Sequence, residues 1–273
     1  MNIQDKYEQL KTILRDMGQI AIAYSGGVDS NFLAKVATDV LGERAIAITM
    51  IAPLHSEGEM EEANELAKEI GIRRIIIKED VLENEVFKTN PEDRCYHCKK
   101  LIFTKIQQIA KSEGIELVAD GSNLDDMGDY RPGLKAIKEL GVRSPLKEAN
   151  LNKQEIRDLS KMLNLSTWNK AAFACLATRF PYGETITKES LRAIEKAERY
   201  LYEEGFKQYR VRCHGNLARI EVLAEDRNRF FDTKYMDQIS NKFKEFGFTY
   251  VSLDLNGYRM GSMNESIDIV EVN

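Results

Sequence analysis

Short apolar runs alternate with amphipathic stretches through the first half of this 273-residue chain. The apolar runs predict strands at 19–24, 44–51, 73–77 and 116–119. The stretches around them predict helices at 3–17, 31–41, 57–70, 98–113 and 153–163. Continuously apolar strands that alternate with helices indicate a parallel sheet covered on both faces. The pattern therefore predicts a doubly wound α/β domain whose ligand lies beyond the carboxyl ends of the strands.

A different order of elements follows residue 165. Here the sequence predicts a helix at 188–204, strands at 209–213 and 217–223, a helix at 226–246 and a strand at 250–255. The residues between the first two strands, HGN, are typical of a hairpin turn. We therefore expect two domains, a doubly wound domain at 1–165 and a smaller α+β domain at 166–273.

The charge balance and the N-terminal segment limit the partners and the compartment. Lys and Arg number 39 against 44 Asp and Glu, and this acidic balance argues against a nucleic-acid partner. The first residues lack the apolar core of an export signal, and no apolar run approaches the roughly 20 residues that span a bilayer. We expect a cytoplasmic protein with no membrane partner. Thiols stay reduced there, so the four cysteines are not expected to form structural disulfides.

The segment SGGVDS at 25–30 joins the first predicted strand to the next helix. Its glycines let backbone N–H groups approach a phosphate, its serines add hydroxyl donors, and the helix start adds partial positive charge. Asp29 would repel a bare anion, so its presence implies a bridging Mg²⁺. The alternative is an ordinary tight turn, but the position between strand and helix favours a nucleotide site. Its candidate residues are Ser25, Gly26, Gly27, Asp29 and Ser30.

A second polar segment, DGSNLDD at 120–126, follows the predicted strand at 116–119. The carboxyl end of a parallel strand is where such folds bind ligands. Taken alone, the segment is more simply interpreted as an Asx turn with a solvated acidic patch. Beside the glycine loop we favour a nucleotide site, with the candidates Gly121, Asn123, Asp125 and Arg131.

Three of the cysteines form a candidate ligand set. Cys95 and Cys98 form a C-x-x-C at the start of a predicted helix, and Cys175 lies in the loop that opens the second domain. A C-x-x-C alone fits zinc, an iron–sulfur cluster or a redox pair, and a zinc site completed by a histidine stays open. Three thiolates can hold a 4Fe–4S cluster and leave one iron free to present a hydrosulfide. Cys213, on a predicted strand, is interpreted as a small buried hydrophobe.

The predicted hairpin of the second domain carries a charged face. Alternation places Arg210 with Arg212 on one strand and Arg219 with Glu221 on the other. Such a face suits a phosphate or carboxylate, because arginine binds both through two hydrogen bonds. A solvated face with cross-strand salt bridges is equally compatible with the pattern. The opposite face is expected to pack inward through Val211, Cys213, Ala218, Ile220 and Val222.

The segment SGGVDS resembles the pyrophosphate-binding loop of the PP-loop ATP pyrophosphatases, which include GMP synthetase, NAD synthetase, argininosuccinate synthetase and tRNA-thiolating enzymes. With the C-x-x-C, the stretch at 120–133 and the segment ACLATRFPYG at 174–183, the chain is similar to the LarE family from about residue 20 to 231. LarE proteins are the ATP-dependent sulfur transferases of nickel-pincer nucleotide biosynthesis.

The LarE resemblance implies an activity and its cofactors. The enzyme would use ATP and Mg²⁺ to adenylylate a pyridinium carboxylate mononucleotide and convert the carboxylate to a thiocarboxylate. Some members sacrifice the sulfur of a cysteine at the position of Cys175. This chain also has Cys95 and Cys98, so it is similar to members thought to carry sulfide on a 4Fe–4S cluster. The resemblance further implies a sulfide donor and a homo-oligomer.

The same resemblance assigns roles to residues and domains. Cys95, Cys98 and Cys175 would be catalytic, the domain at 1–165 would bind ATP, and the domain at 166–273 would serve substrate binding and sulfur transfer. The residues assigned to the substrate are Arg179, Glu198, Arg210, Arg212 and Glu221. For Arg179, a structural ion pair is equally compatible with the sequence.

Three other functions remain open at this point. A tRNA thiolase of the same superfamily can combine a PP-loop with similar cysteines, although the acidic balance and the lack of a basic run argue against it. An ammonia-using amide synthetase would need no cysteine ligands. A nucleotide-binding assembly protein would bind ATP without releasing pyrophosphate.

Overall fold

The structure is a computed structural model of the chain and describes residues 2–52, 57–127, 132–170, 175–259 and 262. The chain forms two compact units. Unit 1 consists of Met1–Val81 and Asp93–Phe173, and unit 2 consists of Leu82–Glu92 and Ala174–Asn273. The units therefore divide eight residues after the expected position, and a short segment from the first half of the chain belongs to unit 2.

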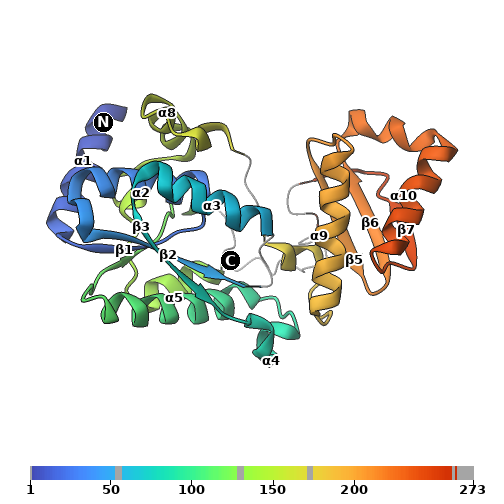
Figure 1. Cartoon of the computed structure of the whole chain (residues 1–273), viewed down its shortest axis with the longest axis horizontal. Helices are drawn as coiled ribbons and strands as arrows, with labels where there is room; N and C mark the ends of the chain where they lie inside the picture. Colours follow the sequence, from blue (N-terminus) through green and yellow to red (C-terminus); the bar gives the residue numbers. More distant parts are fainter. Residues whose placement is uncertain (1, 53–56, 128–131, 171–174, 260–261, 263–273) are drawn as a thin grey trace, which may run out of the picture. The chain divides into compact units, whose positions relative to one another are not determined.

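Unit 1 is built on a four-stranded parallel sheet with the order β3-β2-β1-β4 (Figure 1). Its strands are β1 (Ile20–Ala23), β2 (Ala45–Ile51), β3 (Arg73–Lys78) and β4 (Val118–Ala119). Its helices are α1 (Ile3–Met17), α2 (Val28–Leu41), α3 (Glu57–Ile70), α5 (Arg94–Ser112), α6 (Pro132–Glu139), α7 (Pro145–Glu148) and α8 (Lys153–Met162). This sheet, flanked by helices, confirms the predicted doubly wound α/β class. Short 3₁₀ turns complete the unit, including η3 (Leu124–Met127) and η4 (Ser166–Asn169).

Alternate residues of the central strands face two separate cores. Ile20 and Ile22 pack with the buried residues of α1 and α2, whereas Ala21 packs with buried residues of α5. Figure 1 shows these helices on opposite faces of the sheet. Both faces are therefore covered, as the continuously apolar strands predict. The polar loops at the carboxyl ends of β1 and β4 lie next to each other, because these two strands are neighbours in the sheet.

Unit 2 contains a smaller mixed sheet with the order β5-β6-β7. The strands are β5 (Tyr209–His214), β6 (Leu217–Val222) and β7 (Tyr250–Leu253). The first two form the predicted antiparallel hairpin, and β7 pairs with β6 in parallel. The helices are α4 (Glu85–Lys88), α9 (Lys188–Glu203) and α10 (Thr233–Glu245), with the 3₁₀ turns η5 (Leu176–Arg179) and η6 (Ala224–Phe231). This confirms the smaller α+β region. In the described part of either unit, no helix combines the length and apolarity that crossing a membrane requires.

The prediction of a single helix at 226–246 is wrong. The structure has η6 and α10 there, separated by Asp232. Asp232 adopts an extended conformation, and its carboxylate accepts hydrogen bonds from the backbone N–H groups of Lys234 and Tyr235. An aspartate that caps the following helix in this way ends the preceding turn.

The segment Leu82–Glu92 is held in unit 2 by hydrogen bonds around Asn90. The carbonyl oxygen of Asn90 accepts from the N–H of Gly183 at 2.8 Å, and its side-chain amide donates to the carbonyl oxygen of Pro181 at 2.6 Å. Asn90 is completely buried and has a φ of 55°. Contacts this far apart in sequence leave no local pattern, so the order of elements predicts this segment as part of the first domain.

Candidate active site

The loop after β1 has the geometry of an anion site. Gly26 has a φ of 71°, and a Cβ added there would lie 2.8 Å from the Cβ of Ala63 on α3. Glycine is therefore required both by the backbone conformation and by the packing of the loop. Gly27 is the N-cap of α2. Because glycine has no side chain, the N-cap residue supplies no side-chain hydrogen bond to the first N–H groups of this helix. The first N–H groups of α2 thus point to where a phosphate would bind.

The two serines of this loop contact each other. The hydroxyl oxygens of Ser25 and Ser30 are 3.1 Å apart, and the backbone N–H of Ser25 donates to the Ser30 hydroxyl at 3.3 Å. The hydroxyl of Ser30 also donates to the carbonyl oxygen of Gly27 at 3.3 Å. These long bonds join the start of the loop to the first turn of α2. The same hydroxyls are able to turn toward a bound phosphate.

Asp29 is the charged residue of the loop and has two polar partners among the residues that the structure describes. The ammonium of Lys153 lies 2.5 Å from its Oδ2 atom, and the side-chain amide of Asn123 donates to its Oδ1 atom at 3.4 Å. The Asp29 side chain is 24% exposed. The carboxylate therefore remains accessible, and a cation that replaced these N–H donors would find an oxygen ligand.

The segment after β4 lies against the start of α2, as the sequence predicts. A Cβ on Gly121 would lie 3.0 Å from the backbone nitrogen of Ser30, so glycine is needed for this close approach. Asn123 reaches Asp29, and the carboxylate of Asp125 accepts from the backbone N–H of Lys153 at 2.9 Å. The structure thus places Gly121 and Asn123 against the loop, and Asp125 reaches it through Lys153, which pairs with Asp29. The fourth candidate, Arg131, lies outside the described residues.

Two lysines outside the predicted motifs also contact the loop. Lys153 begins α8 and pairs with Asp29. Lys170 donates to the carbonyl oxygen of Gly26 at 3.1 Å and lies 2.8 Å from Glu62 on α3. Both lie more than a hundred residues from the loop in sequence and belong to no recognisable motif. The only available signal was that an acidic residue in an anion site requires cations nearby.

The cysteines differ in exposure and in their position along the chain. Cys95 is exposed and Cys98 half-buried, both at the start of α5 in unit 1. Cys175 is exposed and precedes η5 in unit 2. Within the described ranges, no three His, Cys, Asp or Glu side chains are grouped so that they could hold a metal ion. The three-cysteine ligand set therefore remains a proposal.

Cys213 has the environment of a structural thiol. Its side chain is 2% exposed and donates to the carbonyl oxygen of Gly215 at 3.3 Å. Burial, with the nearby Glu184 carboxylate, raises the pKa of the Cys213 thiol to about 11. A thiol that stays protonated near neutral pH is a poor nucleophile and a poor metal ligand.

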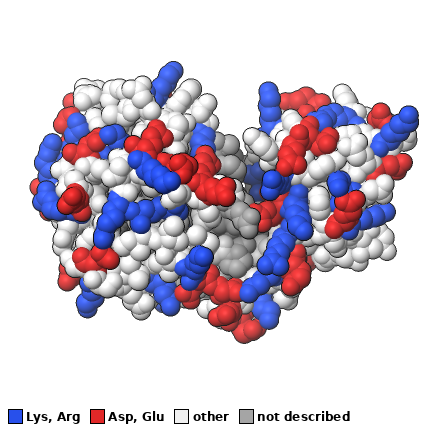
Figure 2. Space-filling view, viewed as in Figure 1, with Lys and Arg blue, Asp and Glu red and all other residues white. Residues whose placement is uncertain are grey.

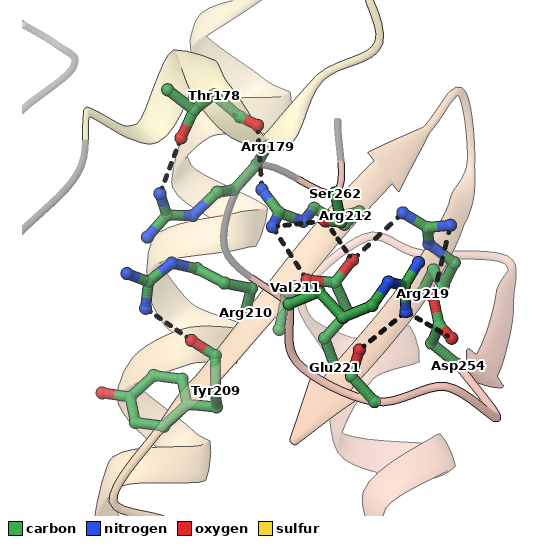
Figure 3. Close-up of polar contacts among 12 residues, drawn as sticks. Thr178, Arg179, Tyr209, Arg210, Val211, Arg212, Arg219, Glu221, Asp254 and Ser262 are labelled. Atoms are coloured by element: carbon green, nitrogen blue, oxygen red, sulfur yellow. Dashed lines mark hydrogen bonds and ion pairs between the residues drawn. The ribbon is translucent and has the colours of Figure 1, made fainter. Parts of the chain in front are cut away.

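Two arginines of unit 2 form buried ion pairs, of which Figure 3 shows the pair between Arg212 and Glu221. The guanidinium of Arg179 donates twice to the carboxylate of Glu198, with both distances 2.8 Å. Arg212 donates to Glu221 at 2.8 Å, and Glu221 is completely buried. Arg219 also reaches Glu221, at 3.1 Å. The cross-strand salt bridges that the sequence left open are therefore present.

Arg210 has a different environment from these arginines. It donates to the carbonyl oxygen of Tyr209 at 2.6 Å, and its guanidinium carbon lies 5.4 Å from the ring centre of Tyr258. Burial and the neighbouring positive charge of Arg179 lower the pKa of Arg210. A bound anion would offset both effects by favouring the charged guanidinium, so this environment is compatible with an anion-binding group.

Comparison with known proteins agrees with this geometry. The NAD synthase family matches residues 3–95. A protein of Lactiplantibacillus plantarum, pyridinium-3,5-bisthiocarboxylic acid mononucleotide synthase, is 38% identical over 263 residues, which cover 96% of this chain and 95% of that protein. An uncharacterized protein of Synechocystis is 44% identical over 262 residues, covering 96% and 98%. A glutamine-hydrolyzing GMP synthase component of Archaeoglobus fulgidus is 25% identical over 222 residues, covering 74% and 70%. The chain therefore belongs to the LarE family of ATP-dependent sulfurtransferases, within the PP-loop ATP pyrophosphatases.

Proposed function

We propose that this enzyme adenylylates a carboxylate of a pyridinium mononucleotide and replaces one carboxylate oxygen with sulfur, in the biosynthesis of the nickel-pincer nucleotide. The observation that carries the proposal is the full-length similarity to the Lactiplantibacillus synthase. The loop geometry supports it, because an uncapped helix start stabilises the negative charge that develops on departing pyrophosphate.

The reaction has two steps. A substrate carboxylate oxygen attacks the α-phosphorus of ATP, and the bond from that phosphorus to the β-phosphate bridging oxygen breaks, releasing pyrophosphate. Hydrosulfide then attacks the acyl carbon and loses its proton, while the bond from carbon to the AMP oxygen breaks. The products are a thiocarboxylate and AMP. A second cycle on the other carboxylate would give the dithio product.

We propose that the loop after β1 holds the phosphates. The backbone of Gly26 and Gly27 and the hydroxyls of Ser25 and Ser30 would donate to phosphate oxygens. Asp29 fits Mg²⁺, which prefers carboxylate and phosphate oxygens. The ammonium group of Lys153 would then leave Asp29 and pair with a phosphate oxygen instead.

We propose that Cys95, Cys98 and Cys175 hold a 4Fe–4S cluster. Their exposure fits this role, since a ligating thiolate must be reachable, whereas the buried Cys213 does not fit. When bound, the cluster would supply an iron position that carries sulfide.

In unit 2, we propose that the five charged residues assigned from the sequence serve the substrate. Glu198 and Glu221 would orient Arg179 and Arg212 through the ion pairs described above. Arg210, whose described contacts are with a carbonyl oxygen and an aromatic ring, would meet the substrate phosphate directly.

The surface supports a small-molecule substrate over tRNA. On the face of each unit shown in Figure 2, acidic and basic side chains are interspersed rather than gathered into a basic field. The net charge of −5 points the same way.

Anaerobic purification, followed by addition of MgATP, sulfide and the dicarboxylate nucleotide, tests the proposal. We expect bound iron and several thiocarboxylate products per polypeptide in the wild type, and loss of both in Cys95→Ala, Cys98→Ala and Cys175→Ala. Cys213→Ala is the matched control and should keep both. Conversion of Cys175 to a residue lighter by one H₂S, without iron, would contradict the cluster. Absence of thiocarboxylate in the wild type, with ammonia-dependent release of AMP that is unchanged in Cys95→Ala and Cys98→Ala, would favour an amide synthetase instead.

A further inference from the structure

A buried polar network contacts Tyr24, the residue that immediately precedes the phosphate loop. Thr49 on β2 donates its hydroxyl hydrogen to the carbonyl oxygen of Tyr24 at 2.8 Å, and the same hydroxyl oxygen accepts from the Nε atom of Arg74 on β3 at 2.9 Å. Thr49 is 2% exposed. A single hydroxyl group therefore connects the outer strand of the sheet to the residue that precedes Ser25.

The bond from Thr49 constrains the first donor of the loop. The peptide group that links Tyr24 to Ser25 is planar, so the direction of the Tyr24 carbonyl determines the direction of the Ser25 N–H. That N–H faces the hydroxyl of Ser30 inside the loop. Rotation of this peptide group would remove the Ser25 N–H from the loop and place a carbonyl oxygen, which repels phosphate, nearby.

The side chain of Tyr24 fixes the other end of the loop. Its phenol donates to the Oδ1 atom of Asn31 at 2.7 Å, and the amide of Asn31 donates to the hydroxyl of Thr167 at 3.1 Å. Tyr24, Asn31 and Thr167 are each at most 2% exposed. Burial raises the pKa of the Tyr24 phenol, so the group stays protonated and remains a donor.

The environment of Arg74 is costly for stability. Its two terminal nitrogens are buried and have no hydrogen-bond partner in the described structure, and its guanidinium carbon lies 5.9 Å from the Tyr24 ring centre. Unpaired buried donors on a charged group destabilise a fold. An apolar residue of similar length would avoid that cost, so stability alone does not account for an arginine here. Arg74 is connected to the phosphate loop through its hydrogen bond to Thr49.

From this network we infer that Thr49 and Arg74 are positioning residues for the phosphate loop, with Thr49 orienting the Ser25 amide and Arg74 orienting the Thr49 hydroxyl. Neither residue belongs to the SGGVDS segment. The inference rests on the proposed pyrophosphate-binding role of the loop, but it does not depend on the sulfur step.

Calorimetric titration of the full-length protein with magnesium pyrophosphate tests this inference. Thr49→Val, which removes the hydroxyl and keeps the shape, should weaken binding about tenfold. Thr49→Ser restores the hydroxyl and should stay within about threefold of the wild type. Equal affinities of the two variants would overturn the inference.

Arg74→Met separates positioning from stability. We expect pyrophosphate binding to weaken about threefold, because Thr49 keeps its bond to Tyr24 but loses its orienting partner. The midpoint of urea unfolding should stay unchanged or rise, because two unpaired buried donors are removed. A fall in the unfolding midpoint with unchanged affinity would show a merely structural role and overturn the inference. If the variants behave as predicted but no thiocarboxylate forms in the wild type, the proposed sulfur chemistry fails and the positioning role stands.

Discussion

The phosphate loop of unit 1 and the charged hairpin of unit 2 are both suited to anions, but by different means. The loop uses backbone N–H groups, two serine hydroxyls and one accessible carboxylate, and it keeps its shape through glycines and a polar network beneath it. The hairpin buries full charges and neutralises them internally, as Arg212 does with Glu221. We therefore expect a substitution in the loop to affect binding more than folding, and one in the hairpin to affect folding first.

Removing the buried carboxylate of the hairpin should have the largest effect. Glu221→Gln takes the negative charge away from Arg212 and Arg219, and we expect the free energy of unfolding to fall by about 3–5 kcal/mol. Urea denaturation measures this loss. The control is Glu203→Gln, which breaks an exposed pair with Arg199 and should cost less than about 0.5 kcal/mol. A loss below about 1 kcal/mol for Glu221→Gln would remove the contrast between the two regions.

Gly26→Ala should affect both folding and binding. The new Cβ meets Ala63 and the backbone has a positive φ, so we expect about 2–4 kcal/mol of destabilisation and no detectable ATP binding. Gly18→Ala is the matched control, because Gly18 has a φ of 70° but no atom within 4 Å of an added Cβ. It should cost about 1 kcal/mol and leave ATP binding unchanged. Normal ATP binding by folded Gly26→Ala would contradict the role of the loop.

Lys153→Met tests whether a substitution beside the phosphate loop affects binding more than folding. The pair with Asp29 is partly exposed, so we expect less than about 1 kcal/mol of destabilisation but about a tenfold rise in the KM for ATP. Lys35→Met breaks a comparable pair with Asp39 on α2 and serves as the control. Steady-state kinetics across ATP concentrations separate the two variants. The same KM in both would mean that Lys153 has no part in nucleotide binding.

The smallest expected effect concerns Cys213 and pH. The folded pKa of this thiol is about 11 against an ordinary value of 9, so the native state holds the proton more tightly than the unfolded state. The associated stability is present below about pH 9 and is lost as the pH rises toward 11. Between pH 8 and pH 10, the free energy of unfolding should fall in both proteins. The fall should be about 1 kcal/mol larger in the wild type than in Cys213→Ala. Parallel pH dependence in both proteins would show that the thiol is not buried as described.

Much of unit 1 could be predicted from local sequence. Strands such as Ile20–Ala23 are apolar on both faces, and SGGVDS has a composition that few turns share. The contacts of Lys153, Lys170 and Thr49 with the loop could not be predicted, because single residues far away in sequence carry no periodicity and no motif. Only the fold brings them to the carboxyl ends of the strands.

In unit 2, strand alternation correctly predicted which residues of the hairpin pack inward. Val211 and Ile220 are at most 1% exposed. The pattern could not reveal that Arg212 and Glu221 of the charged face are buried as well. Glu221 is covered by the hydroxyl of Ser262, which accepts from Arg212 and donates to the carboxylate, and this residue lies 41 positions further along the chain. Whether a charged face is solvated or buried depends on such distant segments.

The proposed reaction requires that a substrate carboxylate, rather than water, attacks the α-phosphorus of ATP and is then displaced by sulfide. Isotope transfer measures this step. A dicarboxylate nucleotide whose carboxylates carry heavy oxygen is incubated with the enzyme, MgATP and sulfide, and the isotopic mass of the AMP formed is determined. We expect each AMP released with a thiocarboxylate to carry one heavy oxygen atom. Unlabelled AMP, or ADP in place of AMP and pyrophosphate, would contradict the proposed reaction.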